Sequence, residues 1–181
     1  MLKRAFEGFG VYMLKSGISF EKAKQLFEFM VSFNKGDHFH QLGLGIDAVG
    51  DGSVRVKLPW GEHLVGNPDT GVIHGGVLTT MLDTCCGFAT CTALEEPELC
   101  PTMDLRIDYM RPATPGKTLY AEGEVYKVTE HVIFTRGVAY HDDKNKPVAY
   151  CVANFSRLDK AIAAQVAQQF RAVIDSFGAE S

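Results

Sequence analysis

Residues 71–83 read GVIHGGVLTTMLD, and this stretch decides the fold. The overlapping run 77–93 is mostly apolar or small and lacks proline, so it predicts a largely buried helix. His74, Gly75 and Gly76 would form the N-terminus of this helix, where the first backbone N–H groups have no partner inside the helix. The positive end of the helix dipole lies there, and glycine lets a ligand approach closely. Such an end suits a developing oxyanion.

One carboxylate, Asp83, lies inside the predicted helix, between Leu82 and Thr84. Its charge is costly to bury without a partner or a purpose. At a rise of about 1.5 Å per residue, Gly75 and Asp83 are roughly 12 Å apart along the helix axis, too far to act on one small reacting group. If both are catalytic, an isologous dimer with antiparallel helices would place Gly75 of one subunit opposite Asp83 of the other. The enzyme interpretation therefore predicts an obligate homodimer with two equivalent sites.

The pattern around the helix predicts an α+β fold. Alternating apolar residues after the turn at Asp51-Gly52 indicate two strands before the loop 59–73. Four more strands are predicted after the helix, at about 102–110, 118–127, 131–141 and 147–156. Two strands, one long helix and four strands are typical of an antiparallel sheet wrapped around the helix.

Helical spacing of apolar residues predicts one further helix at each end of the chain. The first covers 19–33 with Ser19 as its N-cap, and the last begins at Asp159 and ends at Gly178. The chain then divides into an N-terminal helical extension (1–40), a central domain (41–158) and a C-terminal helix (159–181).

Composition indicates one globular domain with short additions, since 46% of the 181 residues are hydrophobic and 22% are charged. A formal charge of −4 gives no general attraction for nucleic acid or an anionic membrane, so we expect neither as a partner. Glu7 interrupts the first apolar stretch, no apolar run is long enough to cross a bilayer, and the five cysteines are an odd number without secretory context. These features favour reduced thiols and a cytoplasmic location.

Three blocks of the sequence resemble hotdog-fold acyl-CoA thioesterases of the PaaI-like (phenylacetyl-CoA thioesterase) group, within the 4-hydroxybenzoyl-CoA thioesterase superfamily. The blocks are 66–76 together with Asp83, 102–112 and 147–155. His-Gly-Gly alone is a weak signal, but an Asp nine residues on and a later Arg-Pro strand end make it more specific. The resemblance covers roughly residues 40–158 and implies a hotdog thioesterase domain over 41–158.

The resemblance also implies roles for individual residues. In similar enzymes the residue matching Gly75 polarises the thioester carbonyl through its backbone N–H, and the side chain matching His74 helps to hold that end of the site. The residue matching Asp83, from the other subunit, is the general base on water or the nucleophile. A hydroxyl residue at the start of the next strand assists this carboxylate in similar enzymes, and Thr102 takes its place here. Similar enzymes usually have a polar residue, often Asn, six positions before the histidine. This chain has Pro68 there, and Asn67 is the residue just before it.

For substrate binding we expect Gly76, Arg106 and Arg111. Because the chain is acidic overall, the phosphates of coenzyme A must meet a local basic cluster. The candidates are Arg106, Arg111, Lys117, Arg136 and Arg157. Coenzyme A is expected only as part of the substrate, with no metal and no redox cofactor.

Each candidate also has a structural interpretation. Asp83 could be a carboxylate that neighbouring groups satisfy, the glycines could serve close packing, and His74 could be only a cap. Strict alternation puts Thr102 on the polar face of its strand with Asp104 and Arg106, so a bulge or an exposed strand start is needed to turn it toward the site.

Cysteine and histidine patterns give little support for a metal site or a thiol nucleophile. Cys85 and Cys86 are adjacent and in no Cys-x-x-Cys pair, so they are interpreted as small core residues. His38 and His40 have no third ligand at a recognisable spacing and are interpreted as solvated loop histidines.

The sequence thus predicts hydrolysis of an acyl-CoA thioester in a homodimer, with association into a homotetramer left open. Two alternatives remain: a non-catalytic acyl-CoA-binding protein that uses the same groove, and a hotdog hydratase acting on enoyl or hydroxyacyl thioesters. The acyl group accepted depends on how Phe88, Leu64, Trp60 and the N-terminal helix close the groove.

Overall fold

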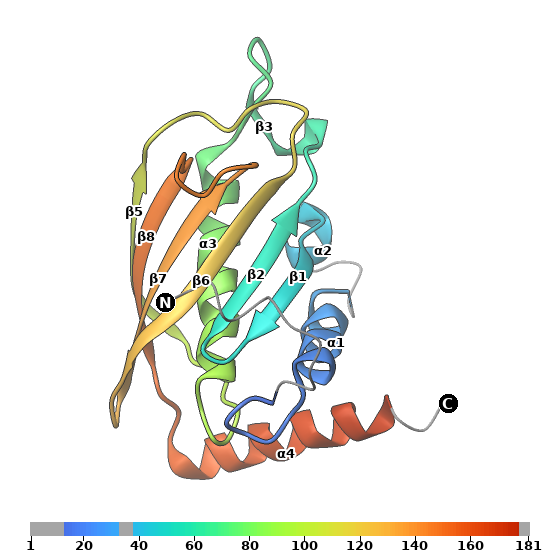
Figure 1. The fold of residues 1–181 in the computed structure, drawn as a ribbon, viewed down its shortest axis with the longest axis vertical. Coiled ribbons are helices and arrows are strands. Elements are labelled where there is room, and N and C mark those ends of the chain that lie inside the picture. The colour runs from blue at the N-terminus through green and yellow to red at the C-terminus, as the bar shows by residue number, and fades with distance from the viewer. Residues whose placement is uncertain (1–12, 33–37, 178–181) are drawn as a thin grey trace.

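The computed structural model describes residues 13–32 and 38–177. A six-stranded antiparallel sheet wraps around one long helix, α3 (Gly75–Thr92), as Figure 1 shows. The order across the sheet is β1-β2-β6-β7-β8-β5, so β1 and β5 are its edges. The strand bounds are β1 (Gly45–Gly50), β2 (Ser53–Leu58), β5 (Thr102–Tyr109), β6 (Leu119–Val128), β7 (Val132–Tyr140) and β8 (Ala149–Ser156). The predicted α+β arrangement, with two strands of the main sheet before the helix and four after it, is confirmed.

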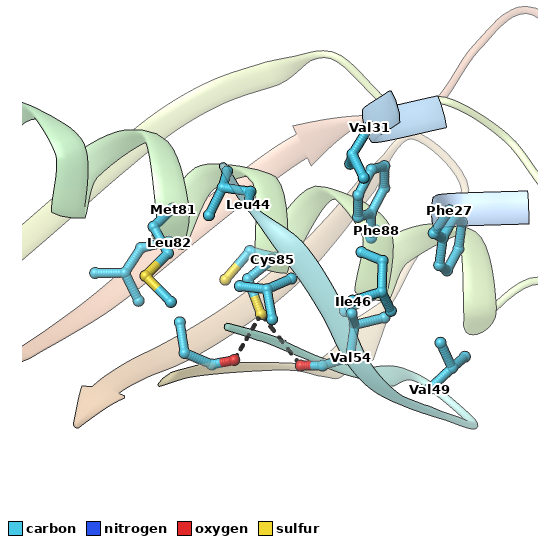
Figure 2. Close-up of a cluster of buried hydrophobic side chains, with 14 of the residues drawn as sticks. Phe27, Val31, Leu44, Ile46, Val49, Val54, Met81, Leu82, Cys85 and Phe88 are labelled. Atoms are coloured by element: carbon cyan, nitrogen blue, oxygen red, sulfur yellow. Dashed lines mark hydrogen bonds between the residues drawn. The ribbon is translucent and has the colours of Figure 1, made fainter. Parts of the chain in front are cut away.

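Close contact between α3 and the middle of the sheet forms the core. Figure 2 shows the Cys85 thiol of α3 directed at two backbone carbonyls, those of Val54 (3.1 Å) and Ala121 (3.3 Å). A Cβ atom at Gly123 of β6 would lie 2.9 Å from the Cys85 backbone, so this approach requires a glycine. Cys85 and Cys86 are fully buried, in agreement with their interpretation as core residues.

The helix α1 (Phe20–Ser32) closes the core beside β1. Its Phe27 ring stacks on Phe88 of α3, with ring centroids 4.6 Å apart, and Figure 2 shows both rings in the buried cluster. Such a pair adds about 0.5–1.5 kcal/mol beyond its buried area. The Ser19 hydroxyl accepts a hydrogen bond from the Lys22 N–H (3.3 Å), in agreement with its predicted capping role.

The C-terminal helix α4 (Lys160–Ser176) crosses one end of the sheet in Figure 1. As predicted, Asp159 caps it, because its carboxylate accepts from the Ala161 N–H at 2.9 Å. The predicted stop at Gly178 lies outside the described residues.

Two segments differ from the sequence prediction. The interpretation of His38 and His40 as loop residues is wrong, because both lie in the short helix α2 (His38–Leu42). The segment 59–73, predicted as a loop, contains a 3-10 turn, η2 (Glu62–Leu64), and a hairpin of β3 (Val65–Asn67) and β4 (Val72–Ile73). These elements are too short for a hydrophobic period to reveal them.

No helix in the two described ranges is long and apolar enough to span a bilayer.

Candidate functional site

Asp83 and Thr102 are in direct contact. The Thr102 hydroxyl donates a hydrogen bond of 2.8 Å to Asp83 Oδ1, across 19 residues of sequence. Asp83 is half-buried on α3, and Thr102 begins the edge strand β5. The structure therefore joins the predicted carboxylate to the predicted assisting hydroxyl within one chain.

A bulge in β5 makes this contact possible. The register shifts between Thr102, which is opposite Phe155, and Asp104, which is opposite Asn154, so Met103 is the extra residue. Thr102 therefore shares the inner side of the sheet with Leu105. The strict alternation that grouped Thr102 with Asp104 and Arg106 is wrong, because one inserted residue reverses the face of everything before it.

A cleft of about 510 Å³ surrounds Asp83 and runs along α3 between β5 and α2. This volume is in the range of small-molecule sites. Its polar lining includes Thr80, Asp83, Thr84 and Thr102, and its apolar lining includes Phe39, Phe88, Leu99, Leu105 and Phe155. Of the residues expected to shape the groove, Phe88 lines this cleft. Leu64 is buried in the core instead, and the Trp60 indole N–H donates to the Gly71 carbonyl (3.0 Å).

At the N-terminus of α3, His74 is the N-cap. Its Nδ1 accepts from the Gly76 N–H at 3.0 Å. A Cβ at Gly76 would lie 2.9 Å from that nitrogen, so glycine lets the ring close the cap. Among the described residues no hydrogen-bond acceptor occupies the Gly75 N–H, and the atoms nearest to a Cβ there would be those of the Tyr109 side chain, at 3.5 Å. The first helical N–H is therefore available to an external acceptor.

Two other predicted residues, Asn67 and Arg111, belong to segments that approach this helix end: β3 pairs with β4, which leads into α3, and β5 reaches Gly75 through Tyr109. Asn67 ends β3, and its Oδ1 accepts from the Asp69 N–H (3.0 Å), which shapes the turn that leads back to His74. Arg111 follows β5 and is exposed. Within one chain, Asp83 and Thr102 are together, whereas Gly75 lies about 12 Å away from Asp83 along the α3 axis.

The five basic residues that could bind coenzyme A phosphates differ in whether a carboxylate already pairs with them. Four pair with carboxylates of the same chain: Arg106 with Asp108, Lys117 with Asp142, Arg136 with Glu124 and Arg157 with Glu98. No carboxylate in the described part of the chain pairs with Arg111. Arg111 is thus the cation of this set best placed to meet an external phosphate.

Two further side chains near the site, those of Tyr109 and His38, were not predicted as site residues. The Tyr109 hydroxyl donates to the Gly75 carbonyl (3.0 Å) and lies 2.8 Å from the Thr79 hydroxyl. His38 lines the cleft, with its Nε2 3.2 Å from the Thr80 hydroxyl. Tyr109 lies in block 102–112, which carries part of the family resemblance, so the sequence did contain a signal for it. The His38 contact spans 42 residues, and no local pattern signals it.

A thiolate or metal site has little physical support. Burial raises the pKa of the Cys100 thiol, which lines the cleft, to about 11, and it also raises the pKa of Cys85 and Cys91. A thiol with such a pKa stays protonated at neutral pH. Over residues 13–32 and 38–177, no three His, Cys, Asp or Glu side chains converge as metal ligands.

The chain resembles known proteins over its central domain. The family model described as the thioesterase superfamily matches residues 70–148. A solved Pseudomonas aeruginosa protein is 43% identical, with 77% of this chain and 98% of that chain covered and a TM-score of 0.65. The chain belongs to the thioesterase superfamily. The Escherichia coli PaaI protein from the phenylacetic acid degradation operon, 22% identical with 77% and 95% coverage and a TM-score of 0.64, shares the fold. The predicted PaaI-like hotdog fold is confirmed.

Among curated proteins, this thioesterase-superfamily chain is 36% identical over 90 residues to a Halobacterium salinarum protein provisionally named an esterase. That match covers 48% of this chain and 58% of the relative. The chain spans somewhat more than half the length of the curated relatives it matches.

Proposed function

We propose that this protein hydrolyses acyl-CoA thioesters to a free acid and coenzyme A, as a homodimer. The observation that carries the proposal is the Asp83–Thr102 pair in a cleft with an apolar lining. The hydroxyl donates to Oδ1, which leaves Oδ2 to accept a proton from water or to attack the carbonyl carbon. The proposal includes Asp83 either as the general base or as the nucleophile.

The oxyanion site would be the N-terminus of α3. His74 occupies the Gly76 N–H, so the Gly75 N–H is the donor left for the thioester oxygen, and the helix dipole favours the negative charge that develops there. Since Gly75 and Asp83 are too far apart within one chain, the donor would come from a second subunit.

The position of the edge strand β5 supports one geometry for that dimer. Tyr109 contacts Gly75 and Thr102 contacts Asp83, so β5 runs antiparallel to α3 along the same stretch. A two-fold axis between Thr102 and Tyr109 would therefore bring the Asp83 end of one copy to the Gly75 end of the other. An open strand edge with Met103 and Tyr109 62% and 54% exposed favours such pairing.

Arg111 would meet the phosphates of coenzyme A, and Asn67 and Gly76 would shape the entrance next to Gly75. Arg106 is held by Asp108 at 2.9 Å and would have to leave that partner to bind substrate. No step in this mechanism requires a metal or a redox cofactor.

Chromatographic measurement of thioester loss tests the proposal without thiol reagents, which would react with the cysteines. Short, medium, long and aryl acyl-CoAs are compared for wild type and Asp83→Asn. Turnover that the variant loses supports the thioesterase. Binding without turnover in both proteins would indicate an acyl-CoA-binding protein, and a hydroxylated thioester without free thiol would indicate a hydratase.

A further inference from the structure

Gly87 lies in the interior of α3, where glycine is among the least favourable residues. Packing explains other glycines near this helix. A Cβ at Gly123 would lie 2.9 Å from the Cys85 backbone, and a Cβ at Gly137 would lie 2.8 Å from Cys151 Sγ. At Gly87 a Cβ would touch only the Phe155 ring, at 3.5 and 4.0 Å, which is ordinary van der Waals contact. Packing therefore does not require glycine at this position, and its φ is not positive.

The position of Gly87 in the cleft supplies another reason. Gly87 lines the cleft four residues after Asp83, so the two share one face of α3. Phe155, which a Cβ at Gly87 would touch, and the adjacent Phe88 both line the cleft and are apolar. Because Gly87 has no side chain, space remains in the cleft between the Asp83 carboxylate and these apolar residues.

We infer that Gly87 determines acyl-chain specificity by keeping open the part of the cleft that receives the acyl chain beyond the thioester carbonyl. The inference rests on the proposed function and names its substrate class, acyl-CoAs with an apolar tail that passes Asp83 toward Phe88. Gly87 is about 6 Å beyond Asp83 along the helix axis, so only acyl groups that reach this far meet a side chain placed there.

The direct test compares wild type, Gly87→Ala and Gly87→Val on butanoyl-, octanoyl- and dodecanoyl-CoA. For Gly87→Ala, kcat/KM for octanoyl-CoA relative to butanoyl-CoA falls at least about tenfold, the scale of one methyl group in an apolar pocket. Gly87→Val moves the preferred length further toward short chains. The ratio is internal to each variant, so a change in the folded fraction cancels.

Thermal unfolding provides an independent readout, because alanine is the better helix former. Gly87→Ala raises Tm by about 2 °C or more while it narrows the substrate range. A purely structural glycine would instead give a lower Tm, and an equal loss for all chain lengths. Either that pattern or an unchanged chain-length profile would overturn the inference.

Binding separates this inference from the proposed function. In an Asp83→Asn background, Gly87→Ala raises the Kd for octanoyl-CoA, relative to that for butanoyl-CoA, at least about tenfold. This measurement needs no turnover, so it stands even if the protein only binds acyl-CoA. Absence of a length-dependent change in Kd contradicts the role of Gly87, whereas binding without turnover by wild type contradicts the thioesterase alone.

Discussion

The two ends of the proposed reaction centre lie on one helix but depend on different parts of the chain. At the N-terminus of α3, His74 binds the N–H of Gly76, two residues away, and the cap forms within one short segment. At the middle turn, Asp83 binds Thr102 from another element, and the contact exists only because β5 has a bulge. The oxyanion end is thus fixed locally, whereas the carboxylate end is fixed by the sheet.

Asp83→Asn removes the charge from the carboxylate end and has the largest expected effect. The loss of a general base lowers kcat by at least about a hundredfold, while the Thr102 hydroxyl can still donate to the amide oxygen. Steady-state kinetics check this, with Asp51→Asn, at the exposed turn between β1 and β2, as the control. A near wild-type rate would remove Asp83 from the mechanism.

Gly75→Pro tests the oxyanion end by removing one N–H. Proline suits the first position of a helix, and His74 already has the extended conformation (ψ 136°) that a residue before proline adopts. We expect α3 to remain folded and kcat to fall about a hundredfold, the usual cost of one oxyanion donor. Circular dichroism verifies the helix, and retained kcat in a folded variant would exclude this N–H.

Thr102→Val sharpens the comparison at the carboxylate end. Valine keeps the shape but removes the hydrogen bond to Asp83, so kcat falls about tenfold with little change in KM, consistent with a bond to a charged group. Thr114→Val, at an exposed loop threonine, is the matched control. A loss confined to KM would mean that Thr102 contacts substrate instead of Asp83.

His74→Ala affects mainly stability. The loss of the cap lowers the free energy of unfolding by about 1 kcal/mol, or Tm by roughly 2–4 °C. His74→Asn restores most of it, because asparagine is a good N-cap. If neither variant changes Tm, the cap does not stabilise α3.

The difference between the two ends also explains what the sequence could predict. The buried helix, the six strands of the sheet and both terminal helices follow from hydrophobic periods, and the structure confirms them. The cap at His74 could be predicted because its partner, Gly76, is only two residues away in the sequence. The same alternation rule that located β5 placed Thr102 on the wrong face, because a bulge leaves no reliable mark in one sequence.

The cleft was the least predictable feature. Its wall on α2 contains His38 and Phe39, whose partners Thr80 and Phe88 are distant in sequence, and a five-residue helix has no detectable period. In the sequence, Gly87 is only a glycine inside the predicted helix, where it weakens the helix. Its significance depends on the space around it, which requires the positions of Phe155 and Asp83 in three dimensions.

The central claim, that each reaction centre combines Asp83 of one subunit with Gly75 of the other, is tested most directly by subunit complementation. Asp83→Asn and Gly75→Pro chains are each nearly inactive as homodimers. A mixed dimer would place both defects in one site and leave the second site intact. Random exchange of equal amounts should therefore restore roughly a quarter of wild-type activity, since half of the dimers are mixed and each has one intact site of two.

The measurement is acyl-CoA turnover before and after subunit exchange, with mixed dimers quantified by native mass spectrometry. Recovery toward one quarter of wild-type activity, in proportion to the mixed dimers, is the predicted result. Mixed dimers that form in full yet remain as inactive as their parents would contradict the claim, because each site would then lie within a single chain.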